Sequence, residues 1–217
     1  MKAIYFFFSF VLMLNITACT NSDSDASMLD GSSLFDSVKS TYGVEAVALP
    51  VEGVSGIPSV SVNEMQCVLE ALRKYANVNT NCSVEESTEK YFGTKDEQAR
   101  KVTMGNTYRA TTGTGSLLEE FVLKVQLKFS TEGGQVYYFG TDYTYDSNLF
   151  NWRANGLSLT PAKNAEKYTY EFESESFLYF KVKDQGNCVV KVPVIFKGNY
   201  NLKSEKGTYS FQLLKCM

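Results

Sequence analysis

Histidine is absent from this chain of 217 residues. Its absence excludes catalysis by Ser-His-Asp or Cys-His groups, zinc sites that use histidine, and histidine as a general acid or base. Any catalytic chemistry would have to use carboxylate pairs, tyrosine, lysine or a metal ion held by oxygen ligands.

Two further features are missing. The longest apolar stretch, residues 3–14, is shorter than the roughly 20 residues that cross the hydrocarbon core of a membrane. A basic stripe is missing as well, because 21 Lys and Arg residues are scattered among 24 Asp and Glu residues and the net charge is −3. We therefore expect no nucleic-acid partner.

The N-terminus has the order of a secretory signal. Lys2 gives a positive start, the apolar residues 3–14 follow, and the small-residue box Ile16-Thr17-Ala18-Cys19 comes next. This order resembles the signal peptide of bacterial lipoproteins. The resemblance implies that residues 1–18 are removed, that the thiol of Cys19 carries a diacylglycerol, and that this lipid anchors the chain to a membrane.

Residues 19–33 are expected to connect this anchor to the folded part of the chain. Residues 20–27 are rich in Ser and Asp, a composition typical of a flexible polar tether. The same stretch is similar to the export signal of lipoproteins of the Bacteroidota, which implies an outer-membrane location and, if the signal works, exposure at the cell surface. A plain linker is the alternative. The resemblance covers only residues 1–25, and residues 34–217 are expected to form one domain.

Four cysteines remain in the predicted mature chain, and an even number in an oxidising compartment favours two disulfides. We predict the pairs Cys67–Cys82 and Cys188–Cys216. Chain length just allows Cys82 to fold back to Cys67. Cys188 and Cys216 face each other if the last hairpin is centred on Leu202, whereas a turn signal a few residues later would break that match. The alternative to the disulfides is free buried thiols.

One amphipathic helix is predicted after residue 60. Ser61 and Glu64 have the spacing of a capping box, in which each side chain bonds a backbone N–H of the other residue. Cys67 is predicted to lie on the polar side of this helix. Apolar residues recur at helical spacing and form one stripe: Val62, Met65, Val68, Leu69, Leu72, Tyr75 and Ala76.

The rest of the chain has the pattern of β-strands. Apolar and polar residues alternate over residues 121–129 and 168–173, and Asn155-Gly156 is the strongest hairpin signal. The predicted fold class is α+β, with one amphipathic helix packed on a curved antiparallel β-meander of about seven or eight strands. The alternative is a β-barrel or sandwich with an outer helix.

Aromatic residues on the predicted strands are the first candidates for a binding site. Trp152, Tyr137, Tyr143 and Tyr145 could present flat rings that stack on sugar rings. The alternative is structural, because aromatic residues are ordinary strand formers that pack in cores.

Acidic residues are the second candidates. Glu171, Glu173 and Glu175 line one face of a predicted strand, at polar positions that predict exposure to solvent. A glycosidase instead needs one carboxyl group whose pKa is raised by burial. Oxygen ligands for calcium gather within ten positions but lack the spacing of an EF-hand loop: Asp142, Asp146, Asn148 and Asn151. We expect no metal and no cofactor.

The function expected from these observations is that of a lipid-anchored envelope lipoprotein that is not an enzyme. Its domain is expected to bind a glycan or a protein. Two alternatives remain: a periplasmic carrier that holds a small apolar ligand inside a curved sheet, and a hydrolase that uses carboxylates.

Overall fold

The computed structural model describes residues 31–51, 54–75, 80–81, 83–87, 98–132, 135–161 and 168–213. These ranges contain two α-helices, a short 3-10 helix and eleven strands. Their order is α1 (Gly31–Tyr42), β1 (Glu45–Val47), β2 (Ser59–Val60), α2 (Val62–Tyr75), β3 (Thr80–Asn81), β4 (Ser83–Ser87), β5 (Gln98–Thr111), β6 (Leu117–Glu132), β7 (Gln135–Asp146), β8 (Asn151–Pro161), β9 (Thr169–Val182), η1 (Lys183–Gln185), β10 (Cys188–Asn201) and β11 (Lys206–Leu213). Within these ranges, no helix has the length and apolar character that crossing a membrane requires.

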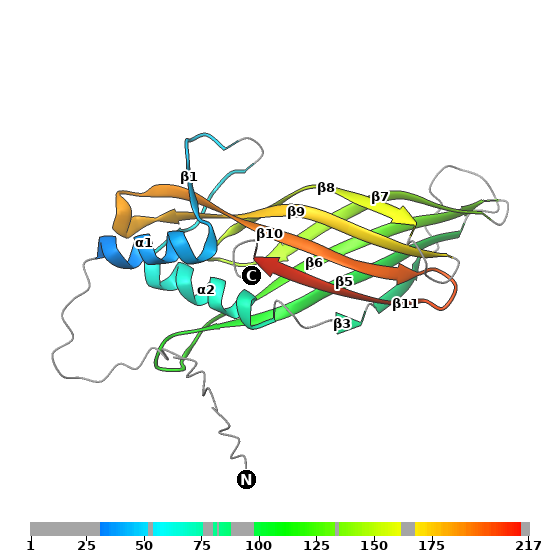
Figure 1. Ribbon diagram of the computed structural model, residues 1–217, viewed down its shortest axis with the longest axis horizontal. Helices are drawn as coiled ribbons and strands as arrows, with labels where there is room; N and C mark the ends of the chain where they lie inside the picture. The colour runs from blue at the N-terminus through cyan, green and yellow to red at the C-terminus, as the bar shows by residue number, and fades with distance from the viewer. Residues whose placement is uncertain are drawn as a thin grey trace, which may run out of the picture.

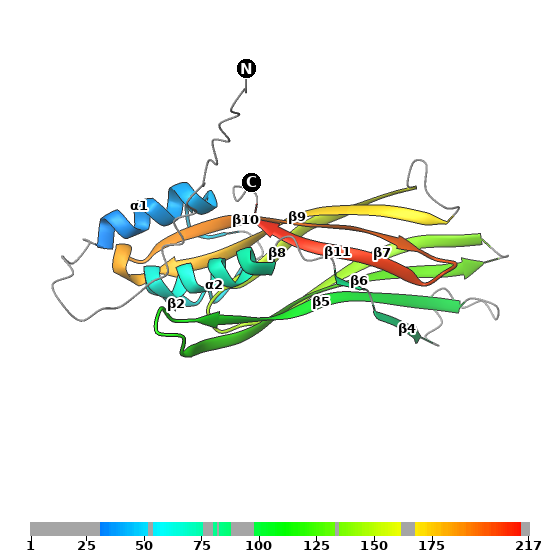
Figure 2. The same ribbon diagram turned by 60° about the horizontal axis from the view of Figure 1, so that its bottom comes forward.

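The strands form two sheets that face each other along the long axis of the molecule (Figures 1 and 2). The smaller sheet has the order β4-β5-β6-β7, and the larger sheet is built on β8-β9-β10-β11. The three short strands extend the larger sheet, since β1 pairs with β10, β3 with β11, and β2, in parallel, with β9. The chain passes from the larger sheet to the smaller one between β3 and β4, and returns to the larger sheet between β7 and β8.

Aromatic side chains fill the space between the two sheets. Alternate residues of β6 are buried from Phe121 to Phe129, as the alternation predicts. Rings from opposite sheets meet in pairs with centroid distances of 5.7–6.4 Å: Tyr108 with Phe211, Phe129 with Tyr200, and Tyr143 with Trp152. The arrangement is a two-layer sandwich with a packed interior.

Helix α2 closes one end of this sandwich (Figure 2). The predicted capping box is present: the backbone N–H of Ser61 donates to Glu64 Oε2 (2.6 Å), and that of Glu64 donates to Ser61 Oγ (3.1 Å). The described part of the predicted stripe is buried, from Val62 to Leu72. Cys67 differs from its prediction, because it is half-buried and packs against the core.

The fold agrees with the α+β prediction at the level of class, but not in its details. Among the described residues, nine strands have three residues or more and two have two residues, which exceeds the predicted seven or eight. The consecutive antiparallel strands do form meanders, but the meander divides into two facing sheets after β7. A second helix, α1, precedes α2 and begins at Gly31, inside the stretch expected to be the tether.

The Asn155-Gly156 hairpin prediction is wrong. Residues on both sides of this pair belong to one strand, β8, and pair with the same neighbour, since Asn155 lies opposite Glu175 and Ser158 opposite Glu173. The left-handed backbone of Gly156 (φ 52°) forms a bulge in β8 instead of a turn. The Oγ of Ser174 donates to the Gly156 carbonyl at 2.6 Å and fixes this bulge.

The register of the last hairpin removes the reason for pairing Cys188 with Cys216. Asn201 lies opposite Lys206, so the hairpin is centred between Lys203 and Ser204 and not on Leu202. Cys216 lies outside the described residues. Leu213 pairs with Val194, about 20 Å along β10 from Cys188. Three residues add at most about 11 Å of reach, and the Cα atoms of a disulfide lie within about 7 Å, so the register gives this pairing no support and it stays a prediction.

The other predicted pair also gains no support from the register. Cys82 lies outside the described residues, but the next residue, Ser83, pairs with Thr103 on β5. Cys67 lines a hollow together with Arg109, which is about 20 Å farther along the same strand. The Cys67–Cys82 disulfide therefore stays a prediction for which the neighbouring residues give no support.

Candidate functional site

The aromatic residues predicted to bind sugars mostly face the interior. Trp152 is 6% exposed and contacts the rings of Tyr143 and Phe211. Tyr143 pairs with the buried Val125 of β6, so both side chains lie on the inner face of the smaller sheet. Tyr145 is on the same face at the edge strand β7, where it is 38% exposed, and the Tyr137 side chain is outside the described part. The prediction of an aromatic binding face is therefore wrong for Trp152 and Tyr143.

Burial also changes the pKa of Tyr143. Desolvation raises the pKa of its hydroxyl above the ordinary value, and a 3.0 Å hydrogen bond with Ser174 Oγ opposes this shift in part. The hydroxyl thus stays protonated at neutral pH and links β7 to β9 across the sandwich.

The acidic candidates lie on the outer face of the larger sheet. Glu171, Glu173 and Glu175 alternate with the buried Phe172, Ser174 and Ser176 along β9, and all three glutamates are exposed, as predicted. Antiparallel register places Lys197 of β10 opposite Glu173, and Asn199 opposite Glu171. The alternation of each strand thus aligns polar side chains in rows across the sheet.

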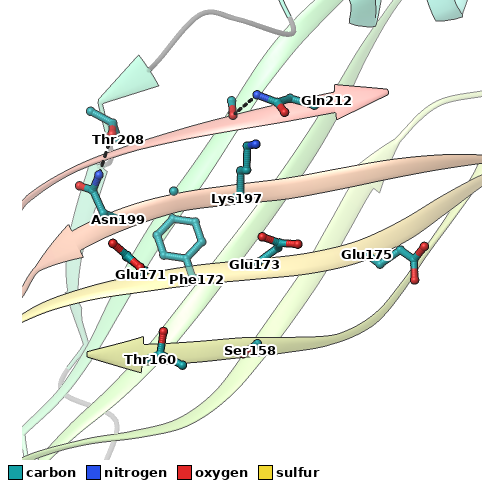
Figure 3. Close-up of a pocket in the computed structure, with 12 residues that line it drawn as sticks. Ser158, Thr160, Glu171, Phe172, Glu173, Glu175, Lys197, Asn199, Thr208 and Gln212 are labelled. Carbon is teal, nitrogen blue, oxygen red and sulfur yellow. Dashed lines mark hydrogen bonds between the residues drawn. The ribbon is translucent and has the colours of Figure 1, made fainter. Parts of the chain in front are cut away.

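These rows form a polar trough, defined by the residues that line a hollow of about 680 Å³ across β8, β9, β10 and β11 (Figure 3). Two hydrogen bonds fix part of its lining: Asn199 Nδ2 donates to Thr208 Oγ1, and Gln212 Nε2 donates to Ser210 Oγ, both at 3.3 Å. The lining consists of Ser158, Thr160, Glu171, Phe172, Glu173, Glu175, Lys197, Gly198, Asn199, Thr208, Ser210 and Gln212. Carboxylate, ammonium, amide and hydroxyl groups therefore converge on one concave surface.

The charged groups of the polar trough have no partner within the described part of the chain. Neither the three glutamates nor Lys197 forms an ion pair or a hydrogen bond there, although Lys197 lies opposite Glu173 in the register. Elsewhere the chain pairs exposed charges: Arg109 Nε lies 3.1 Å from Glu120 Oε1, and Lys191 Nζ lies 3.0 Å from Glu45 Oε2. The trough thus presents one positive and three negative groups whose hydrogen-bonding capacity is available to a ligand.

A smaller hollow of about 340 Å³ lies next to the trough and shares Glu175 with it. Its floor includes the half-buried Phe177 and Pro193, and the ammonium group of Lys191 lies 5.0 Å from the centre of the Phe177 ring. Glu45 of β1 and the preceding Val44 border this hollow. An apolar ledge therefore limits the trough at the end nearer to α1.

Three of the four oxygen ligands considered for calcium have other roles. Asp142 forms an ion pair with Lys128, and the side chain of Asn148 donates to Glu119. Asn151 Nδ2 donates to the carbonyl of Ser55 at 2.6 Å. The described residues contain no group of three or more His, Cys, Asp or Glu side chains placed to hold a metal ion.

The sequence located one strand of the trough and missed the others. The alternation that exposes Glu171, Glu173 and Glu175 was visible, whereas Lys197 and Asn199 reach the same surface only through the pairing of β9 with β10. Polar residues also alternate along β10 and β11. Together with the correct centre of the last hairpin, this alternation could have placed the polar residues of both strands beside the glutamates.

Comparison with known proteins gives one family. The model of a family described as a domain of unknown function (DUF5033) matches residues 26–213, so the chain belongs to that family. The match spans both sheets and all four strands of the trough. No curated protein and no solved structure matches the chain.

Proposed function

We propose that this member of the DUF5033 family is a lipid-anchored envelope lipoprotein whose sandwich domain binds a glycan or a protein without catalysis. The order of Lys2, the apolar run and the box that ends in Cys19 supports the lipid anchor. The Ser/Asp-rich residues 20–27 support an outer-membrane location with export to the cell surface. The polar trough supports the binding role.

The observation that carries the binding role is the group of unpaired charges in the trough. Its volume of about 680 Å³ falls in the range of ligand sites, roughly 300–1,000 Å³. Lys197 and the three glutamates can each make charge-assisted hydrogen bonds to a ligand, which are stronger than neutral ones. The neighbouring hydroxyl and amide groups can satisfy the hydroxyl groups of a sugar or the backbone of a peptide.

The geometry favours binding over hydrolysis. A general acid needs a carboxyl group whose pKa is raised by burial, and Glu171, Glu173 and Glu175 are all exposed. It also gives no support to an interior ligand, because the space between the sheets holds packed aromatic rings such as Phe121 and Phe150, 5.1 Å apart between centroids. The non-catalytic binding module is therefore the function that we propose.

The test compares two charge-matched double variants of the mature protein. Glu173→Gln with Lys197→Met alters the trough, and Glu120→Gln with Lys124→Met removes the same two charges from exposed positions on β6. Binding is measured by native gel retardation and calorimetry against envelope polysaccharides and envelope proteins. We expect the trough variant to lose about ten-fold or more in affinity and the β6 variant less than about two-fold.

Equal affinity of the trough variant and the wild type for a ligand that the protein binds would contradict the assignment of the site. The location is tested separately by protease treatment of intact cells, with a periplasmic lipoprotein as the protected control. Cleavage of the domain is the expected result, and protection of a domain that is protease-sensitive when purified would place it in the periplasm.

A further inference from the structure

The connection between β1 and β2 exposes apolar side chains. Leu49 is 60% exposed, the largest value among the exposed large hydrophobic residues of the described ranges, and Val51, Val54 and Ile57 are half-buried. These four residues and Pro50, which we call the apolar loop, line a hollow of about 500 Å³ with Lys181 and Val189. Residues 52–53 lie outside the described part and are not included in it.

Hydrogen bonds hold the apolar loop to the larger sheet. The backbone N–H of Lys181 donates to the Pro58 carbonyl at 3.0 Å, and Asn151 Nδ2 donates to the Ser55 carbonyl at 2.6 Å. β1, which leads into the loop, pairs with β10 through three residues. The loop therefore presents Leu49 from a backbone that is held to the larger sheet on both sides.

The apolar loop stands away from the body of the molecule at the same end of the long axis as α1 (Figure 1). Helix α1 begins at Gly31, and the predicted acylated residue is Cys19. The chain between these two residues can span at most about 40 Å when fully extended. The lipid anchor therefore keeps this end of the domain within about 40 Å of the bilayer.

We propose that the apolar loop contacts the surface of the bilayer that holds the lipid anchor, an inference that rests on the proposed acylation of Cys19. Aliphatic side chains favour the boundary between headgroups and acyl chains, and a second contact strengthens attachment by a lipid anchor. Lys181, at the rim of the loop, can keep its ammonium group among the phosphates while its methylene groups cover apolar surface. The loop then fixes the orientation of the domain on the membrane.

The experiment uses the mature acylated protein in vesicles of phosphatidylethanolamine and phosphatidylglycerol whose acyl chains carry bromine, which quenches tryptophan at short range. Leu49→Trp places a probe on the loop, and Leu117→Trp places a matched probe at a residue that is 49% exposed on β6, in the other sheet. The natural Trp152 is buried and contributes the same background to both variants. We expect bromine to quench the Leu49→Trp probe at least about two-fold more than the Leu117→Trp probe.

Equal quenching of the two probes in acylated protein overturns the proposal. A Leu49→Trp emission that depends on protein concentration and not on bromine also overturns it, because a second copy of the chain then covers the loop. The intact mass of the same sample shows whether the acyl chains are present. A missing acyl mass contradicts the anchor of the proposed function and the loop contact with it, whereas an unquenched acylated protein contradicts the loop contact alone.

Discussion

Tyr209 links β11 to the edge of β5, and replacing it with phenylalanine tests this role. Within the described residues, β4 pairs with β5 as far as Ser83 and Thr103. Beyond that point, the Tyr209 hydroxyl of β11 accepts a hydrogen bond from the N–H of Gly105 (2.9 Å) and donates one to its carbonyl (2.7 Å). One side chain thus takes the place of a neighbouring strand for one residue of the edge.

The expected cost of Tyr209→Phe follows from these two bonds and from a 3.2 Å contact of the same hydroxyl with Asn106 Oδ1. Tyr209 is 2% exposed, so the phenyl ring keeps its packing and the change removes only the hydroxyl. A partly buried N–H and a carbonyl then lose their partner, at about 1–3 kcal/mol for each unsatisfied group, reduced where water enters. We expect the free energy of unfolding to fall by about 2–4 kcal/mol, which lowers the Tm by roughly 5–15 °C for a domain of this size.

Urea unfolding followed by circular dichroism measures this difference, with unchanged m-values as the check that only stability has changed. Tyr145→Phe is the matched control, because Tyr145 is 38% exposed and its hydroxyl makes no hydrogen bond within the described residues. That variant should stay within about 0.5 kcal/mol of the wild type. A change of less than about 0.5 kcal/mol in the free energy of unfolding of Tyr209→Phe would show that the edge of β5 does not depend on the hydroxyl.

Two other predictions concern the sheet behind the trough and the cap of α2. A methyl group on Gly198 would lie 2.1 Å from the Thr208 carbonyl oxygen and 2.6 Å from Phe172 Cζ. Gly198→Ala should therefore destabilise the protein by about 1–3 kcal/mol in thermal unfolding. Gly140→Ala is the control and should be close to neutral, because its methyl group would meet nothing within 4 Å. The N–H of Ser61 lowers the pKa of Glu64 below its unfolded value. The stability that this carboxylate contributes is therefore complete above the unfolded pKa and is lost as pH falls through the folded pKa. Glu64→Gln should reduce this loss of stability at acidic pH when unfolding is measured against pH, and an unchanged loss would refute the prediction.

Features that depend on neighbours in the sequence were predictable. The capping box of Ser61 and Glu64 needs only residues three apart, and the buried face of β6 needs only its own alternation. The exposure of Glu171, Glu173 and Glu175 follows in the same way. Each of these predictions uses an interaction or a periodicity that is complete within one element.

Features that depend on pairing between strands were not predictable. Asn155-Gly156 allows a left-handed backbone in a turn or in a bulge, and only the partner strand β9 decides between them. The position of Cys188 relative to Cys216 depends on a hairpin centre that lies between Lys203 and Ser204. Alternation likewise shows that Trp152 shares a face with its i+2 neighbours but not whether that face is the inner one.

The polar trough and the hollow lined by the apolar loop both include residues on the outer face of β9, and this arrangement links the two proposals. Glu173 and Lys181 are both on the outer face of β9, about 26 Å apart along the strand, with the Phe177 ledge between them. When β9 points away from the membrane and the loop is held at the bilayer surface, the distance from the headgroups to the trough is well beyond the Debye length of about 8 Å at physiological salt. Three carboxylates at that distance are not repelled by anionic headgroups, and a polymeric ligand can reach them without crossing the headgroup layer. The proposed bilayer contact and the proposed binding site are thus compatible on one sheet, and the first would set the access of ligands to the second.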